Sequence, residues 1–337
     1  MPTTAELTRQ IDSLLEQAYT PEGPGAAVLL AKDGETLYRR AMGLANLELA
    51  VSLSPEMVFQ IASLTKPFTA QAILMLAEAG QLTVTDPVSK FLPDCTHLAS
   101  ITLEHLLTHT SGLVNYVELP EWWVVHRQDL AVNELIALFK DRPLVSAPGV
   151  RWAYCNSGYA LLGAVIEAIS GQSYAEFVEQ RLLAPLGMRQ SAYENLSRVL
   201  AGRVTGYQVS GEGYMNAEYL SPTHTYAAGA LVSTVDDLAR WSQALFSGQV
   251  LQPETLRRAF SPYRLADGSL ATYGYGWFIA EHQGHALVEH LGSLPGFAHY
   301  MIGVPAERLF VVVLSNRASQ NAVPDQLARQ IIALALG

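Results

Sequence analysis

The chain has 337 residues, of which 50% are hydrophobic and only 15% charged, and its 21 basic and 31 acidic side chains give a formal net charge of -10. An ordinary soluble protein carries about 25% charged residues, so this composition excludes a disordered chain and predicts a large buried core. The acidic balance and the scattered lysines and arginines exclude a nucleic-acid partner, because such binding needs basic clusters that neutralise phosphates.

The N-terminal part begins with a predicted helix and a predicted hairpin. Residues Thr3 to Ala18 have leucine and isoleucine at helical spacing behind a Thr3-x-x-Glu6 capping box, which predicts an amphipathic helix. Two short apolar runs, Ala26 to Ala31 and Thr36 to Ala41, follow. Asp33-Gly34 between them supplies the positive φ values of a tight turn, so the runs predict a β-hairpin.

The middle of the chain is mostly helical. Several stretches have apolar residues at helical spacing, and glycine or proline follows most of them. The predicted helices are Thr65 to Ala79, Leu130 to Phe139, Ser157 to Ile169, Tyr174 to Leu183 and Thr234 to Phe246. Ser63 therefore stands at the N-terminus of the first of them.

The C-terminal part reads as successive strands and a last helix. The predicted strands are Tyr273 to Ala280, His285 to His290, Ala298 to Val304 and Leu309 to Leu314, with one turn over Gly292 to Gly296 and a final helix from Gln326 to Leu336.

Strands at both ends and helices between them predict an α+β fold, in which an antiparallel sheet is flanked by helices from the N- and C-terminal parts. A mostly helical lobe is inserted between those parts. We expect a single catalytic unit over residues 1–337, with a sheet lobe of residues 1–62 and 225–337 and a helical lobe of residues 63–224.

Location and partners follow from what the sequence lacks. Its longest apolar runs fall short of the roughly 20 residues that a spanning helix needs, so we expect no membrane partner. Met1 to Glu6 has neither the basic nor the apolar region of a secretory signal. Cys95 and Cys155 are too few for a disulfide framework. We therefore expect a cytoplasmic protein, and we keep a homo-oligomer open because the surface has few charges.

Ser63 and Lys66 are the first candidates for chemistry. They lie three residues apart at the start of a predicted helix, so their side chains can face one another. A lysine that is withdrawn from water has a lowered pKa and can accept the proton of the serine hydroxyl. The ordinary alternative is a helix cap beside a solvated lysine.

Two later segments add further candidates. Tyr154 can relay a proton, and the Asn156 amide can orient a lysine and a substrate carbonyl. The glycine-containing segment from His290 to Phe297 lets the backbone approach a substrate and bind its carbonyl oxygen. The alternatives are an ordinary N-cap at Asn156 above a packed Tyr154, and a histidine that only stabilises a turn.

The order of these segments resembles the serine β-lactamase and penicillin-binding-protein superfamily, specifically the class C β-lactamase-like branch that includes family VIII esterases and D-aminopeptidases. The resemblance rests on Ser63-x-x-Lys66, on Tyr154-x-Asn156 about ninety residues later, and on His290-x-Gly292 near the C-terminus. It runs from about residue 25 to the end and implies the β-lactamase/transpeptidase-like fold. Three flanking stretches are similar to the family too: Leu106 to Leu113, Ala228 to Thr234 and Gly274 to Trp277.

The resemblance also implies roles for these residues. Ser63 would be the acyl-accepting nucleophile, Lys66 its activating partner and Tyr154 the proton shuttle. Asn156 would be the orienting amide, and the N–H groups of Ser63 and Ser293 would form the oxyanion hole. Whether Lys66 or Tyr154 is the base in acylation stays open, because the two are expected to titrate as a coupled pair. No cofactor is implied.

The third motif departs from the family, in which Lys-Thr-Gly is common. Here it is His290-Leu291-Gly292, which lacks both the lysine charge and the threonine hydroxyl that serve the carboxylate of a penicillin. Leu291 offers no hydrogen bond, and an ordinary histidine is mostly neutral at pH 7. We therefore expect poor turnover of β-lactams, while acyl esters without such a carboxylate remain suitable substrates.

Other patterns are weaker. His105 and His109 lack the glutamate and the third ligand of a zinc protease, so we expect no metal, and His109 is expected to hold a turn by hydrogen bonds. Strand alternation predicts that His282 and His285 point to opposite faces. No G-x-S-x-G pattern is present. Four aromatic residues are candidates for the wall of an acyl pocket, with plain core packing as the alternative: Tyr116, Trp122, Trp123 and Trp152.

The leading hypothesis is a serine hydrolase that cleaves carboxylic esters of short to medium acyl chain through a Ser63 acyl-enzyme. One alternative is a D-amino-acid peptidase or weak β-lactamase of the same superfamily, which would turn over amides or nitrocefin faster than esters. A second, from another class, is a non-catalytic binding protein on the same scaffold. The presence of Ser63, Lys66 and Tyr154 together argues against this second alternative.

Overall fold

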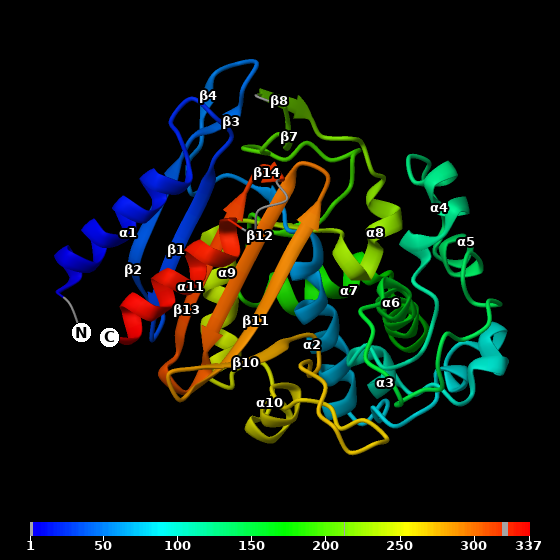
Figure 1. The fold of residues 1–337 in the computed structure, drawn as a ribbon. Helices are drawn as coiled ribbons and strands as arrows, with labels where there is room; N and C mark the ends of the chain where they lie inside the picture. Colours follow the sequence, from blue (N-terminus) through cyan, green and yellow to red (C-terminus); the bar gives the residue numbers. More distant parts are fainter. Residues whose placement is uncertain (1–2, 212, 319–322) are drawn as a thin grey trace.

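The computed structural model describes residues 3–211, 213–318 and 323–337, and it is built around a six-stranded antiparallel sheet (Figure 1). The strand order is β10-β11-β12-β13-β1-β2. The N-terminal strands β1 and β2 join the C-terminal ones through the pairing of β1 with β13. The predicted α+β architecture is thus confirmed. The strands are β1 (Ala26–Lys32), β2 (Glu35–Met42), β10 (Phe278–His282), β11 (His285–Leu294), β12 (Phe297–Val304) and β13 (Leu309–Ser315).

Helices cover both faces of this sheet. Helices α1 (Thr4–Ala18) and α11 (Val323–Leu336) lie on one face, and α9 (Val235–Phe246) packs on β1 and β13 from the other (Figure 1). The side chains of β1 and β13 therefore alternate between two buried hydrophobic clusters, as the two-residue period of a strand requires. Each aliphatic side chain that is fully buried in this way contributes about 1.5–3 kcal/mol.

The remaining elements include a helical layer on the other side of the molecule, where α6 packs against α2, α3 and α8. The other α-helices are α2 (Thr65–Glu78), α3 (Leu103–Leu107), α4 (Pro120–Val125), α5 (Val132–Ala137), α6 (Asn156–Ser170), α7 (Tyr174–Val178), α8 (Pro222–Gly229) and α10 (Pro253–Ala259). The short turns of other helix types are η1 (Ala62–Leu64), η2 (Val88–Lys90), η3 (Pro93–Leu98), η4 (Tyr116–Glu118), η5 (Glu179–Leu183) and η6 (Pro305–Glu307). The small strands are β3 (Leu44–Asn46), β4 (Val51–Ser52), β5 (Phe59–Gln60), β6 (Ala192–Tyr193), β7 (Tyr207–Ser210), β8 (Gly213–Asn216), β9 (Leu231–Ser233) and β14 (Arg317–Ala318).

Two predicted strand boundaries near the C-terminus are wrong. Strand β10 begins at Phe278 instead of Tyr273, because Gly276 has a φ of 82° and turns the chain just before it. Strand β11 runs on to Leu294, so the turn expected over Gly292 to Gly296 is shorter. Pairing with β12 continues through Gly292 and Ser293, which extends the strand past the histidine.

Two predicted helices also differ. The stretch Leu130 to Phe139 forms an α-helix only over α5, and Tyr174 to Leu183 is α-helical through Val178 and then widens into the π-helical turn η5. His282 and His285 are register partners of the β10–β11 hairpin, so the prediction of opposite faces is wrong. They lie on adjacent strands, whereas the alternation rule holds along a single strand.

The proposed lobe boundaries fall inside local structure. Residue 62 lies in η1 and residue 224 in α8. The larger hydrophobic cluster contains residues of both proposed lobes, including Phe68 and Trp241, whose ring centroids stack 4.1 Å apart. The two-lobe division therefore stays a prediction. Within the described ranges, no helix combines the length and the apolar character needed to cross a bilayer.

Candidate active site

Ser63 lies in the short turn η1, directly before α2. Ala62 precedes it with a φ of 53°, in the left-handed region that residues with a Cβ rarely adopt. Neighbouring strands hold this turn in place: the Ile61 N–H donates to the Leu231 carbonyl at 2.9 Å. The turn leads into α2, so Lys66 comes one helical turn after Ser63, as the sequence predicts.

Lys66 Nζ has three hydrogen-bond partners. It lies 3.1 Å from Ser63 Oγ, 2.9 Å from Asn156 Oδ1 and 2.9 Å from the Ala228 carbonyl oxygen. The two carbonyl-type oxygens can only accept, whereas the serine hydroxyl can also donate. A neutral amine therefore fits this site: it donates to Asn156 and Ala228 and turns its lone pair to the Ser63 hydroxyl.

The surroundings of Lys66 favour that neutral form. Its side chain is completely buried, with Nζ 4.7 Å from the ring centroid of Tyr154. Burial lowers its pKa well below the ordinary value for lysine. The other three lysines each have a carboxylate oxygen within 4.0 Å, whereas no such pair involves Lys66 in the part of the chain that the structure describes.

Tyr154 lies beside this pair. Its ring packs over Lys66, and its buried hydroxyl has no hydrogen-bond partner among the described residues. Burial raises the pKa of this hydroxyl, and the nearby Ser63 opposes that effect only in part. Tyr154 is therefore a neutral phenol at neutral pH, with a proton that it can give up to a stronger base.

His290 and Gly292 lie two residues apart on β11 and therefore share one face of the strand. The ring of His290 hydrogen-bonds to the Leu291 carbonyl oxygen at 2.7 Å and to the Tyr273 hydroxyl at 2.8 Å. Burial and the nearby Lys66 lower its pKa to about 3, so it carries no charge at neutral pH. A Cβ at Gly292 would lie 2.6 Å from the Ile61 carbonyl oxygen, so only glycine lets β11 lie this close to the segment that leads to Ser63.

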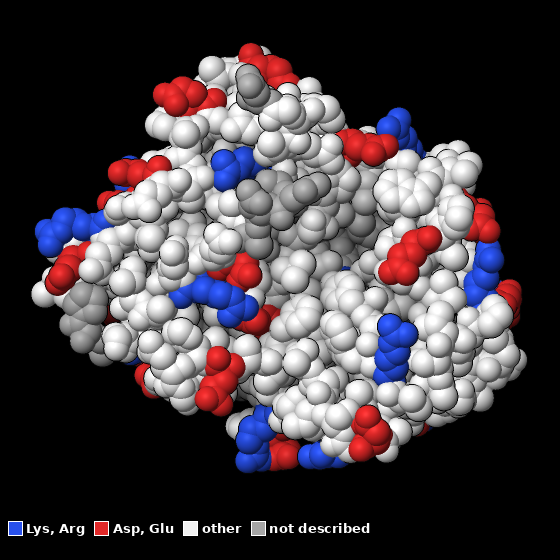
Figure 2. Space-filling model, viewed as in Figure 1, with Lys and Arg blue, Asp and Glu red and all other residues white. Residues whose placement is uncertain are grey.

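A cavity of about 480 Å³ opens onto Ser63. Ser63, Asn156 and Ser293 line it, whereas His290, Gly292 and Leu291 do not. Figure 2 shows charged side chains scattered over this side of the molecule, around a hollow with a mostly uncharged rim.

Aromatic side chains form one wall of this cavity. Three of the four candidate aromatics, Tyr116, Trp122 and Trp123, line it. Trp152 packs on Tyr273 and Phe278 instead, so for this residue the alternative of core packing holds. Among the described residues, the lining contains no lysine or arginine and a single acidic side chain, that of Glu218.

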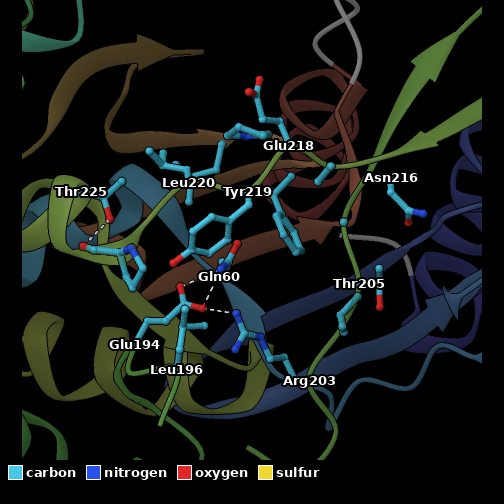
Figure 3. A pocket seen from close by; sticks show the side chains of 17 residues that line it. Gln60, Glu194, Leu196, Arg203, Thr205, Asn216, Glu218, Tyr219, Leu220 and Thr225 are labelled. Atoms are coloured by element: carbon cyan, nitrogen blue, oxygen red, sulfur yellow. Dashed lines mark hydrogen bonds and ion pairs between the residues drawn. The ribbon is translucent and has the colours of Figure 1, made fainter. Parts of the chain in front are cut away.

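A second cavity of about 340 Å³ shares part of its lining with the first. Figure 3 shows the side chains that line this second cavity. Its floor is a network in which the Gln60 amide donates to both oxygens of Glu194, at 2.6 and 2.7 Å, while Arg203 pairs with the same carboxylate. Glu194 is only 4% exposed, and burial raises its pKa. Five residues line both cavities and form the wall between them: Glu218, Leu220, Thr225, Leu294 and Pro295.

Sequence reasoning missed two contributors to the site. The Ala228 carbonyl binds Lys66 through a backbone atom, which no side-chain pattern can indicate, although the stretch Ala228 to Thr234 resembled the family. Glu218 and its neighbour His126, 3.2 Å apart, come from loops far apart in the chain. No spacing rule connects such positions.

The sequence is similar to a known protein family and to individual members of it. The sequence profile of the beta-lactamase family matches residues 11–336. The chain belongs to the beta-lactamase family. Penicillin-binding protein 4* of Bacillus subtilis (strain 168) is 32% identical over 92% of this chain and 72% of its own length. A D-aminopeptidase of Gluconobacter oxydans (strain 621H) is 29% identical over 94% of this chain but only 59% of its own length.

A solved structure agrees with this assignment. The octameric penicillin-binding protein homologue from Pyrococcus abyssi superposes with a TM-score of 0.83 over 100% of this chain and 78% of its own, at 31% identity. The family resemblance and the fold predicted from the sequence are thereby confirmed. The protein is a hydrolase of the serine β-lactamase and penicillin-binding-protein superfamily.

Proposed function

We propose that the protein hydrolyses uncharged carboxylic esters of short to medium acyl chain through an acyl-enzyme on Ser63. The observation that carries the proposal is the set of bonds around Lys66 Nζ, because two obligate acceptors leave only the Ser63 hydroxyl to face the amine lone pair. A lysine with a lowered pKa in this position is a general base for a serine nucleophile.

In acylation, Ser63, Lys66 and Tyr154 pass a proton from the serine hydroxyl to the leaving alcohol. Ser63 Oγ attacks the ester carbonyl carbon while its proton passes to neutral Lys66. The backbone N–H groups of Ser63 and Ser293 stabilise the oxyanion of the tetrahedral intermediate. As the bond to the alcohol breaks, Tyr154 donates its proton to the leaving oxygen, and the Lys66 ammonium returns a proton to the phenolate. The raised pKa of the Tyr154 hydroxyl supports this order, with Lys66 as the base and Tyr154 as the acid.

In deacylation a water molecule gives a proton to neutral Lys66 and attacks the acyl carbon. As the bond to Ser63 Oγ breaks, the Lys66 ammonium gives a proton to this oxygen, which restores the hydroxyl and the neutral amine. Asn156 holds Lys66 in place through both steps, since its Oδ1 accepts from Nζ in either protonation state.

The preference for an uncharged ester is supported by the third motif and by the cavity. His290 is neutral and has both ring nitrogens engaged, while Leu291 is 44% exposed and lacks a hydroxyl. In the part of the chain that the structure describes, no lysine or arginine lines the cavity, so a substrate carboxylate would find no counter-ion among these residues. The aromatic wall suits an apolar acyl chain instead.

A second candidate is the hydrolysis of D-amino-acid amides. The Glu218 carboxylate lines the cavity together with Trp122 and Trp123, a combination that attracts an ammonium group. The similarity to a D-aminopeptidase supports the same candidate. Because Glu218 already pairs with Arg127 at 2.6 Å, its charge is partly neutralised, which places this candidate second.

One panel of assays tests these functions. Wild type and Ser63→Ala are compared on p-nitrophenyl butyrate, nitrocefin and D-alanyl p-nitroanilide, with Ser13→Ala on α1 as the matched serine control. We expect ester turnover that is lost only in Ser63→Ala, and a mass increase on Ser63 after treatment with a fluorophosphonate. Faster turnover of the amide or of nitrocefin would favour the alternatives, and no labelling together with no turnover would favour a non-catalytic binding protein.

Self-association is a separate proposal, supported by the low charge of the chain and by the octameric relative. Light scattering over a concentration series tests it. A single monomeric species at every concentration would contradict it.

A further inference from the structure

His109 binds the backbone on both sides of Tyr154. Its carbonyl oxygen accepts the N–H of Ala153 at 2.9 Å, and its Nδ1 accepts the N–H of Cys155 at 3.1 Å. Ala153 and Cys155 are the residues directly before and after Tyr154. One residue therefore anchors both peptide groups that flank the phenol.

The backbone at His109 explains why a side chain takes part. Its φ is 59°, so the backbone changes direction at His109, whose carbonyl oxygen accepts the Ala153 N–H. In a regular strand pair a second carbonyl would accept the Cys155 N–H, and here the imidazole Nδ1 takes that place. A buried N–H without a partner is costly, so this bond is needed. Because Nδ1 accepts, the ring proton lies on Nε2.

The ring of His109 also supports the phenol directly. Its centroid lies 4.3 Å from that of Tyr154 and 4.6 Å from that of Tyr273, and the residue is 2% exposed. Burial, together with Lys66 and His290, lowers the pKa of His109 well below its ordinary value. The ring is therefore uncharged and places no positive charge beside Lys66.

We propose that His109 is a positioning residue, which keeps the Tyr154 hydroxyl beside Ser63 and Lys66 by anchoring the N–H groups of Ala153 and Cys155 and by packing against the phenol ring. This proposal rests on the proposed function, since it concerns the proton that Tyr154 transfers. It assigns to His109 a role that acts only through Tyr154.

Two substitutions separate the contributions of the acceptor and the ring. His109→Phe keeps a ring but removes the acceptor for the Cys155 N–H. His109→Asn keeps an acceptor at the δ position and tolerates a left-handed φ. His105→Phe is the matched control, because His105 lies on α3 four residues earlier and packs on Tyr263.

Each substitution is made in the wild type and in Tyr154→Phe, and kcat and KM are measured with p-nitrophenyl butyrate, with melting curves to verify folding. General acid–base groups contribute about 10²–10⁴ in rate, so we expect His109→Phe to lower kcat by about tenfold or more with KM changed less than about twofold. In Tyr154→Phe the same substitution is expected to cost less than about twofold, because the group it positions is gone. His109→Asn is expected to recover most of kcat.

A purely structural role predicts something different. If the role is purely structural, His109→Phe lowers kcat by the same factor in the wild type and in Tyr154→Phe, and that result would overturn the proposal. Any effect of the His105→Phe control is expected to be equal in the two backgrounds. If His109→Phe does not fold, His109→Leu, which also lacks the acceptor for the Cys155 N–H, takes its place, and a kcat loss of equal factor in both backgrounds would again overturn the proposal. Full activity in Ser63→Ala would instead disprove the proposed function, whatever the His109 variants show.

Discussion

The two sides of the cleft use their polar groups in opposite ways. At the start of α2, Lys66 is buried without an acidic partner among the described residues, and its three bonds end on Ser63, Asn156 and a backbone carbonyl. On β11 across the cleft, His290 has both ring nitrogens satisfied within the protein, and the exposed Leu291 offers no polar group. Under the proposed function, the side of Lys66 serves proton transfer, whereas His290 and Leu291 offer no charge to a substrate. The proposal therefore assigns reactivity and the recognition of a charged substrate to different elements.

The largest expected effect comes from Lys66→Arg. Arginine keeps the charge but cannot be deprotonated in a protein, so it cannot accept the Ser63 proton. We expect the ester kcat to fall by about 10³-fold or more, close to the loss in Ser63→Ala. Lys90→Arg, at a half-exposed lysine paired with Asp86, is the control and should leave the rate unchanged. An active Lys66→Arg would mean that another group is the base.

Gly292→Ala tests the contribution of β11, where the uncharged His290 and Leu291 lie. The new Cβ would meet the Ile61 carbonyl oxygen at 2.6 Å, so β11 must move away from the nucleophile segment. Displacing reacting groups by about 1 Å can cost about 10²-fold, and overpacking costs about 1–3 kcal/mol in stability. We therefore expect a lower kcat in rate assays and a lower melting temperature in melting curves. Gly213→Ala, where a Cβ meets nothing within 4 Å, should change neither quantity.

The pH dependence of stability tests the uncharged state of Lys66. Its folded-state pKa lies below the ordinary value of 10.5, so the unfolded chain binds more protons between these two values. Stability from this group therefore rises with pH across that window and is lowest below it. In urea titrations, we expect the free energy of unfolding of the wild type to increase relative to that of Lys66→Met as the pH rises toward 10. A constant difference would show that the lysine keeps an ordinary pKa.

Leu291→Thr is expected to have the smallest effect. Leu291 is 44% exposed and does not line the cavity, and surface substitutions usually change free energies by less than about 0.5 kcal/mol. We expect ester turnover to stay within about threefold and nitrocefin turnover to stay low, because the neighbouring His290 still provides no charge. A large gain in nitrocefin turnover would mean that the hydroxyl alone determines substrate class.

The sequence predicted the parts of this molecule that depend on local spacing. The hairpin, most helices and the pairing of N- and C-terminal strands follow from periodicity, and Ser63 with Lys66 follows from a single helical turn. The turn over Gly292 to Gly296 was placed wrongly because glycine in a strand can serve a close approach as well as a bend. The roles of Ala228 and Glu218 depend on tertiary placement alone, which no single sequence pattern encodes.

The wall between the two cavities has a consequence for redesign. Leu220 lines both the cavity at Ser63 and the one floored by Glu194, so one residue helps to separate about 480 Å³ from about 340 Å³ of space. Shortening that side chain would enlarge the space on both sides of the wall without changing Ser63 or Lys66. The size of acceptable acyl group could then be widened in directed evolution by changing a loop residue, while the reaction chemistry stays intact.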